Sequence, residues 1–262
     1  MRSIPSLDDR HSVRTVFTDS ADGQRHADWQ CAEVRAEAFR EYLGVPLERV
    51  FYAYEKDAAD VLDITGECAE KLQNTKKEDI YEHFGGFDAL VTAIPGTMLC
   101  VCAADCLPLF LYDPSTNVAG IAHCGWRGVC AGIVPNTIGV MGAHYGVDPR
   151  QVMAAFGPCI CGRCYEVGGE LRDAFAERFT TSDLLSLFTP KDKGKYLLDL
   201  KESVRLELLR AGVKPAQIYD TDICTYEHRE YPSCRRSGTH IEVRHQIFSG
   251  IALVKRETSE FR

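Results

Sequence analysis

Residues 100–130 read CVCAADCLPLFLYDPSTNVAGIAHCGWRGVC, and they contain most of three apolar runs in quick succession. The runs cover residues 98–104, 108–113 and 118–123, and only short links separate them. Parallel strands need crossovers of a dozen or more residues, whereas antiparallel strands can be joined by tight turns. We therefore expect these runs to be antiparallel neighbours at the centre of a sheet.

Further runs on both sides of this stretch extend the pattern. Apolar runs bounded by turn residues predict strands at 13–18, 49–54, 88–93, 152–157, 217–222 and 250–254. Apolar positions recurring every three or four residues predict helices at 32–43, 128–144, 166–179 and 199–211. The polar segment 66–86 is expected to be a helical excursion rather than a linker. The prediction is an α/β fold with a mixed sheet flanked by helices.

The composition is typical of an ordinary globular protein and excludes several classes. A chain of 262 residues suits one domain over 1–262, and its net charge of −8 disfavours a nucleic-acid binder. Apolar runs of eighteen residues are absent, and the first twenty residues are too polar for a secretory signal, so we expect a cytoplasmic protein without membrane contact. In that compartment most of the twelve cysteines would be reduced.

Two chemically active side chains stand where apolar runs meet turns. Cys106 precedes Leu107 and Pro108 at the end or bulge of a strand, and His123 closes VAGIAH just before CGWRG. If the strands are neighbours, the pair could form a thiolate and an imidazolium for nucleophilic catalysis. Alternatively, both could be zinc ligands at a site with an open position. A buried cysteine and a histidine bonded to backbone are the structural alternative.

Other motifs offer weaker candidates. Arg127 in GWRG lies at an expected strand-to-helix turn, where backbone N–H groups could help it receive an anion. Arg235 and Arg236 in YPSCRRSG could bind phosphate or carboxylate, although a solvated pair is the default. The motif GPCICGRCYEV places Cys159, Cys161 and Cys164 at the spacing of a metal clip, but the sequence offers no evident fourth ligand, so we do not expect a metal there.

Several of these motifs occur together and in the order of a known family. FDALVTAIPG, AADCLPLFLYDP, VAGIAHCGWRG, FGPCICGRCYEVG, YLLDL and YPSCRRSG resemble the YfiH-like, laccase-domain proteins, also named multicopper polyphenol oxidases and later associated with purine nucleoside phosphorylase activity. The resemblance covers about residues 13–254. It implies a single-domain α/β fold related to cysteine hydrolases of the toxin-deamidase type.

The resemblance also implies a metal site. Family members hold zinc, or copper in older descriptions, with one cysteine and two histidines. Cys106 corresponds to the cysteine ligand, His123 to the second histidine ligand, and Arg127 to the arginine of the GWRG turn. The first histidine of the family lies in a Gln-Val-His-Gly motif, where this chain reads YEKDAADV. Asp57 then stands in for the histidine and Glu55 for the glutamine, and a carboxylate can still bind zinc.

The implied activity is cleavage of purine nucleosides with phosphate, with adenosine deamination in some members. Many members begin one helix with Asn-Arg, where this chain has Glu37 and Ala38, and this loss weakens the transfer of phosphorolysis. A metal-free Cys106 and His123 dyad acting as a hydrolase or amidase, with peptidoglycan precursors as one substrate class, is the second hypothesis. A silent member that binds a nucleotide or a partner protein is the third.

Multicopper oxidation fits poorly, because it needs a histidine-rich cluster and only eight histidines are scattered here. The oligomeric state stays open.

Overall fold

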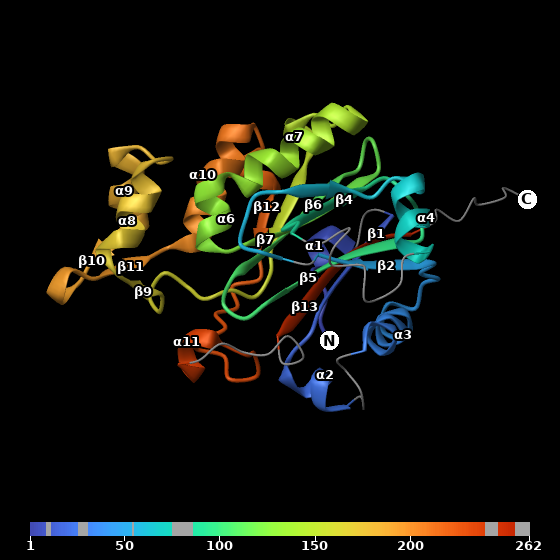
Figure 1. The fold of residues 1–262 in the computed structure, drawn as a ribbon, viewed down its shortest axis with the longest axis horizontal. Coiled ribbons are helices and arrows are strands. Elements are labelled where there is room, and N and C mark those ends of the chain that lie inside the picture. Colours follow the sequence, from blue (N-terminus) through green and yellow to red (C-terminus); the bar gives the residue numbers. More distant parts are fainter. Residues whose placement is uncertain (9–11, 26–30, 54, 75–85, 239–245, 255–262) are drawn as a thin grey trace, which may run out of the picture.

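The strands form two mixed sheets and one small antiparallel sheet (Figure 1). The computed structural model describes the chain except residues 9–11, 26–30, 54, 75–85, 239–245 and 255–262. The four-stranded sheet has the order β1 (Val13–Phe17), β13 (Ile247–Leu253), β5 (Thr97–Ala103), β2 (Arg49–Tyr52). The six-stranded sheet has the order β12 (Ile218–Asp220), β8 (Met153–Phe156), β6 (Leu107–Asp113), β7 (Val118–Cys124), β4 (Ala89–Thr92), β3 (Val61–Asp63). The third joins β10 (Phe188–Pro190), β11 (Tyr196–Leu198) and β9 (Glu166–Val167).

The two large sheets share one apolar core. Leu99 and Ile251 of the four-stranded sheet lie in the same buried cluster as Phe110 and Ile121 of the six-stranded sheet. All four side chains are fully buried, and each such burial contributes about 1.5–3 kcal/mol. Because β6 and β7 are also covered on their other face, every residue in both strands is buried. This explains why their sequences are continuously apolar rather than alternating.

The predicted antiparallel pairing is confirmed for β6 and β7 and is wrong for β5 and β6. In the first pair Pro108 stands opposite His123. β5 instead lies in the other sheet, antiparallel to β13 and parallel to β2. The chain passes between the sheets at Asp105, whose φ of 94° lies in the left-handed region. This turn is the bend that carries Cys106.

Helices cover the outer face of each large sheet (Figure 1). The six-stranded sheet is covered by α6 (Trp126–Ala131), α7 (Ile133–Tyr145) and α10 (Leu200–Ala211), and α3 (Ala32–Leu43) packs on the four-stranded sheet. The helix predicted at 128–144 is in fact two, because Gly132 between them adopts a φ of 93°. The helix predicted at 166–179 begins later, since its first residues form β9 and α8 (Gly169–Ala176) follows.

Shorter elements complete the described fold. The prediction for 66–86 is confirmed by α4 (Gly66–Asn74), and 75–85 lies outside the described residues. The remaining elements are α1 (Pro5–Asp8), α2 (Ser20–Arg25), α9 (Thr181–Leu187), α11 (Cys234–Ser237) and the 3-10 turns Pro149–Gln151, Asp192–Gly194 and Pro215–Gln217. Among the described helices, each is too short or too polar to cross a bilayer.

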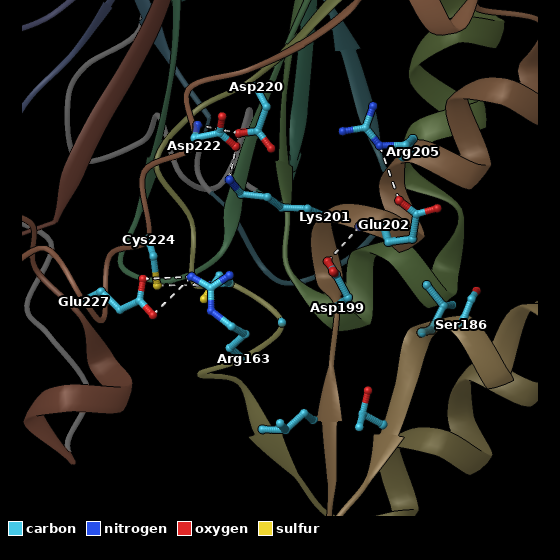
Figure 2. A pocket seen from close by; sticks show the side chains of 15 residues that line it. Arg163, Ser186, Asp199, Lys201, Glu202, Arg205, Asp220, Asp222, Cys224 and Glu227 are labelled. Carbon is cyan, nitrogen blue, oxygen red and sulfur yellow. Dashed lines mark hydrogen bonds and ion pairs between the residues drawn. The ribbon is translucent and has the colours of Figure 1, made fainter.

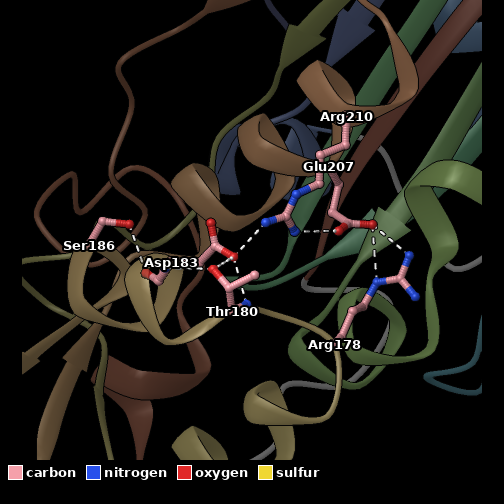
Figure 3. A network of polar contacts seen from close by, with 6 residues as sticks. All are labelled: Arg178, Thr180, Asp183, Ser186, Glu207 and Arg210. Carbon is pink, nitrogen blue, oxygen red and sulfur yellow. Dashed lines mark hydrogen bonds and ion pairs between the residues drawn. The ribbon is translucent and has the colours of Figure 1, made fainter.

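A network of charged side chains joins α9 and α10 to the segment after α8 (Figure 3). Glu207 on α10 is nearly buried, and its carboxylate lies 2.6 Å from Nη2 of Arg178 and 3.3 Å from Nη1 of Arg210. Arg210 in turn contacts Asp183 at 2.5 Å, and Asp183 accepts the backbone N–H of Thr180 in the capping box of α9. One carboxylate thus links three segments.

Glu207→Ala is expected to lower the free energy of unfolding by about 2 kcal/mol. The substitution leaves two guanidinium groups without their shared carboxylate, although their partial exposure reduces the cost below that of a fully buried pair. Urea unfolding measures the loss. Exposed Glu177 offers a matched control, and Glu177→Gln is expected to change stability by less than about 0.5 kcal/mol. Equal effects of the two variants would contradict the structural role of Glu207.

Candidate functional site

Cys106 and His123 lie together beside Gly125, at the edge where β6 begins and β7 ends. A Cβ atom on Gly125 would lie 3.3 Å from Sγ of Cys106, 3.4 Å from Cε1 of His123 and 3.0 Å from Oδ1 of Asp57. Three side chains from separate segments therefore converge on one point beside Gly125. A side chain at position 125 would crowd all three. The structure brings Cys106, His123 and Asp57 together, and their roles stay predictions.

A buried carboxylate, Asp88, fixes the orientation of His123. Oδ1 of Asp88 lies 3.1 Å from Nδ1 of His123, and Asp88 is fully buried just before β4. The same carboxylate accepts the backbone N–H groups of Lys56, Asp57 and Ala58 at 3.2, 3.1 and 2.9 Å. Asp88 therefore holds both the imidazole and the loop that presents Asp57.

Sequence reasoning missed Asp88, although FDALVT contained a signal for it. A carboxylate that directly precedes a continuous apolar strand lies at the end of that strand. It can be buried there only if hydrogen-bond donors or a cation surround it. The sequence could not name those partners, because they come from residues 56–58 and from β7.

The electrostatic environment favours a charged imidazole. Burial alone would lower the pKa of His123, but the nearby Cys106, Glu55 and Asp88 outweigh it and raise that pKa well above its ordinary value. Burial likewise works to raise the pKa of Asp88, but hydrogen bonds from His123 and from backbone N–H groups bring it below its ordinary value. His123 and Asp88 thus form an imidazolium and carboxylate pair. The other imidazole nitrogen of His123 faces the thiol of Cys106.

Glu55 and Asp57, two carboxylates of the same short segment, point to different partners. Glu55 accepts the backbone N–H of Cys102 at 2.8 Å, and the Cys102 thiol lies 3.4 Å from its other oxygen. Burial is the main cause that raises the pKa of Glu55. Asp57, with a φ of 58°, turns its carboxylate toward Gly125 and lies 3.5 Å from Nη1 of Arg127. Asp57 is therefore the carboxylate that faces Cys106.

Cys106 opens into a cleft of about 460 Å³ that combines aromatic and cationic side chains. The Arg127 guanidinium lies 4.4 Å from the ring centre of Trp126, and that of Arg235 lies 5.3 Å from the ring centre of Tyr165. The cleft is lined by Asp57, Ala104, Asp105, Cys106, Trp126, Arg127, Ile160, Tyr165, Leu200, Cys234, Arg235 and Gly238. Such a surface can hold a planar ring and an anion side by side.

The two arginines of YPSCRRSG have different surroundings. Arg235 lines the cleft, and its backbone N–H donates to Asp105 at 2.7 Å. The guanidinium of Arg236 donates instead to the backbone carbonyl groups of Thr225, Tyr226 and Tyr231. Arg236 thus ties the C-terminal loops together, and the structure brings only Arg235 to Cys106.

Asp105 holds the turn that presents Cys106. Its carboxylate accepts the hydroxyl groups of Thr225 at 2.5 Å and Ser233 at 3.0 Å, in addition to the Arg235 N–H. These bonds stabilise a left-handed backbone conformation that is unfavourable for a residue with a side chain. The loop 225–235 therefore controls where the Cys106 thiol lies.

The cysteine motif at 159–164 differs from the prediction made for it. Donor atoms of Cys161, Cys164, Cys224 and Glu227 all lie within 4.8 Å of one another. The expectation that a fourth ligand is missing was wrong, because the fold brings two donors from about sixty residues further along the chain. Cys159 is not a member of this group, and its thiol donates to the backbone carbonyl of Asp105 at 3.1 Å.

Asp88→Asn is expected to lower the free energy of unfolding of chelator-treated protein by about 2 kcal/mol near pH 5–6. The Asp88 pKa is lowered, so its contribution is present above the ordinary value of 3.8 and is lost as the pH falls. The His123 pKa is raised, so its contribution is complete below 6.5 and is lost as the pH rises through the folded-state pKa. Urea unfolding from pH 3 to 10 should therefore show a difference between wild type and variant that shrinks at both ends. A difference that does not change with pH would contradict the ion pair.

Comparison with known proteins places this chain in a family. The model of the family described as "Multi-copper polyphenol oxidoreductase laccase" matches residues 18–244. A protein of Bacteroides thetaiotaomicron named purine nucleoside phosphorylase is 37% identical over 175 residues, which cover 66% of this chain and 63% of that protein. Purine nucleoside phosphorylase YlmD of Geobacillus stearothermophilus is 32% identical over 185 residues, which cover 71% of this chain and 66% of that protein. Both alignments span slightly less than two thirds of the relative.

A solved structure agrees over a longer range. The crystal structure of the hypothetical protein YfiH from Bacillus licheniformis has a TM-score of 0.79 and 25% sequence identity, and the match covers 92% of each chain. The matched family model includes Asp57, Asp88, Cys106 and His123 within its range. The chain therefore belongs to the multi-copper polyphenol oxidoreductase laccase family, whose YfiH-like members share its fold.

Proposed function

We propose that this chain cleaves purine nucleosides with phosphate in the cleft beside Cys106 and His123. The observation that carries the proposal is the convergence of a thiol, a charged imidazole and two arginines around one cleft with aromatic walls. The relatives named purine nucleoside phosphorylase support a reaction on purine nucleosides. The chemistry requires a surface for the base, a site for the phosphate anion and a proton for the leaving purine.

Each requirement has a candidate residue. Trp126 and Tyr165 offer aromatic faces for the purine, and Arg127 and Arg235 offer guanidinium groups for phosphate. A phosphate oxygen attacks C1′ of the ribose, the bond from C1′ to the purine nitrogen breaks, and ribose 1-phosphate forms. In metal-free protein the His123 imidazolium, oriented by Asp88, donates a proton to the departing base, whereas with a metal on His123 the proton would come from the phosphate.

A metal ion fits the donor chemistry of this centre. Cys106, His123 and Asp57 would hold it, because a thiolate, an imidazole and a carboxylate are all ligands that zinc accepts, and copper accepts the first two. Nδ1 of His123 donates a hydrogen bond to Asp88, and metal-binding histidines commonly have such a bond to a carboxylate. Once bound, zinc would act as a Lewis acid that polarises the substrate or activates phosphate or water.

A second candidate is a cysteine hydrolase or amidase without a metal. The sequence of contacts from Cys106 to His123 and from His123 to Asp88 supports this candidate. A thiol, a base and an orienting carboxylate form the usual nucleophilic triad. This candidate predicts that an electrophile labels Cys106 first in metal-free protein. It also predicts that turnover is independent of phosphate.

Incubation of the purified chain with inosine or adenosine, with and without phosphate, separates these reactions. Free base and ribose 1-phosphate that appear only with phosphate are the expected products. Inosine formed from adenosine would instead indicate deamination. Base release independent of phosphate would favour the hydrolase. An absence of turnover in both metal-loaded and metal-free protein would refute phosphorolysis, and an electrophile that does not label Cys106 in metal-free protein would refute the hydrolase.

We also propose that residues 13–254 act as one domain whose partners are small molecules, a nucleoside and phosphate. The match of 92% of the chain to a single solved structure supports one domain. Limited proteolysis tests it, since one protected fragment of nearly full length is expected.

A further inference from the structure

A second cluster of metal-ligating side chains lies outside the Cys106 centre. Cys161 and Cys164 come from the loop before β9, and Cys224 and Glu227 come from the loop after β12. All four donor atoms lie within 4.8 Å of one another. A tetrahedral zinc site with Zn–S bonds of about 2.3 Å has ligands about 3.8 Å apart. The four donors would therefore have to approach one another by about 1 Å at most.

The two loops have the same local construction. The sequences CGRC and CTYE each place two donors three residues apart, the spacing of the paired turns that hold structural zinc. In the first turn the N–H groups of Cys164 and Tyr165 donate to the carbonyl of Cys161 at 2.9 and 3.1 Å. In the second, the N–H of His228 donates to the carbonyl of Cys224 at 2.9 Å. Two matching turns therefore face each other.

Backbone contacts hold the two turns in register. Cys159 pairs with Cys224 in a parallel β-bridge, and the N–H of Thr225 donates to the carbonyl of Cys159 at 3.2 Å. The N–H of Cys161 points at Sγ of Cys224 at 3.3 Å, a contact that favours a thiolate. The donors are thus brought together by the fold and not by chance contacts of exposed side chains.

Charge and access also suit a cation. Three thiolates and a carboxylate would repel one another. Arg163 forms an ion pair with one member of the cluster, 3.2 Å from Glu227. A divalent cation would offset this repulsion. The cluster borders a cleft of about 500 Å³ that gives an ion a path from solvent (Figure 2).

We propose that Cys161, Cys164, Cys224 and Glu227 form a structural zinc site with four protein ligands. This site is separate from the Cys106 centre and does not depend on the proposed function. Since the protein fills all four positions, the ion has no open position for a substrate, as in other structural sites. Its role is to clamp the loop 159–164 to the loop 224–227.

The clamp contacts the turn that presents Cys106 through hydrogen bonds to Asp105 from both loops, those of Cys159 and Ile160 on one side and that of Thr225 on the other. Thr225 follows Cys224 directly, and its hydroxyl donates to Asp105, the neighbour of Cys106. Loss of the metal would therefore loosen the turn that presents Cys106 without removing any group from the cleft. We expect the loss to lower stability first and activity only in proportion to the disorder of that turn.

Metal analysis in the Cys106→Ser background tests the proposal, because this background removes a ligand of the other centre. The untagged chain, purified from zinc-supplemented cells and dialysed against a weak chelator, is expected to retain about one zinc per chain. Adding Cys161→Ser and Cys164→Ser together is expected to remove it. The matched control is Cys68→Ser, whose thiol is half-buried on α4 at the far end of the molecule from β9 (Figure 1). This control is expected to retain the zinc.

A gain-of-ligand variant keeps the test valid if the double serine variant does not fold. Glu227→Cys would raise the thiolate count from three to four. The sulfur-to-metal charge-transfer absorption of the Co²⁺-loaded protein is then expected to rise by about one third. Zinc that persists in the double serine variant, an unchanged Co²⁺ band in Glu227→Cys, or a disulfide among the three cysteines in protein purified under reducing conditions would each overturn the proposal.

Discussion

Cys106→Ala is expected to lower kcat/KM for inosine phosphorolysis at least about 1000-fold. The thiol is a soft donor that lies at the point where His123 and Asp57 converge. In the phosphorylase its loss removes a metal ligand, and in the hydrolase it would remove the nucleophile. Initial rates of base release with saturating phosphate measure the effect.

Controls separate this loss from unfolding. Cys106 is only partly buried, so Cys106→Ala is expected to change the free energy of unfolding by less than about 1 kcal/mol. Cys130→Ser alters another half-buried thiol, on α6, and is expected to retain full activity. Activity of Cys106→Ala within tenfold of wild type would show that the reaction takes place elsewhere.

Arg235→Met is expected to raise the KM for phosphate about 100-fold and to leave the KM for inosine within a few fold. A guanidinium can bind phosphate through two parallel hydrogen bonds, and methionine offers none. Arg235 is suited to this role because its backbone is fixed by Asp105 and its guanidinium lies over Tyr165 in the cleft. Steady-state kinetics with each substrate varied in turn separates the two constants.

Two further variants sharpen this result. Arg235→Lys keeps the charge but loses the paired donors, so an intermediate KM for phosphate is expected. Arg172→Met removes an arginine that likewise lies over a tyrosine ring, that of Tyr196, but does not line the cleft, and it should behave as wild type. A rise in the KM for inosine rather than for phosphate would assign Arg235 to the nucleoside instead.

Much of the fold was predictable because buried strands need unbroken apolar runs. Each of the nine predicted strands has a counterpart in the structure, and the helix at 32–43 has the predicted bounds. The strands that escaped prediction, β3 and β9–β11, are two or three residues long and lack a run that could reveal them. The separation into two sheets also escaped, since it depends on one left-handed residue, Asp105.

The candidate site was predictable only where its residues stand at strand ends. Cys106 and His123 follow from their positions beside apolar runs, and Asp57 followed from the altered family motif. Asp88 and the pair Cys224 and Glu227 were missed, because their roles arise from contacts with residues 30 or more positions away. Sequence spacing records neighbours on one segment, whereas burial and long-range pairing decide which segments meet.

The central claim is that purine nucleosides and phosphate bind in the cleft beside Cys106. The rate at which iodoacetamide alkylates Cys106, followed by mass spectrometry of its peptide, tests the claim most directly. Inosine together with phosphate is expected to slow alkylation of Cys106 at least fivefold and to leave the rate at Cys130 unchanged. An unchanged rate at Cys106 with saturating inosine and phosphate would contradict the account.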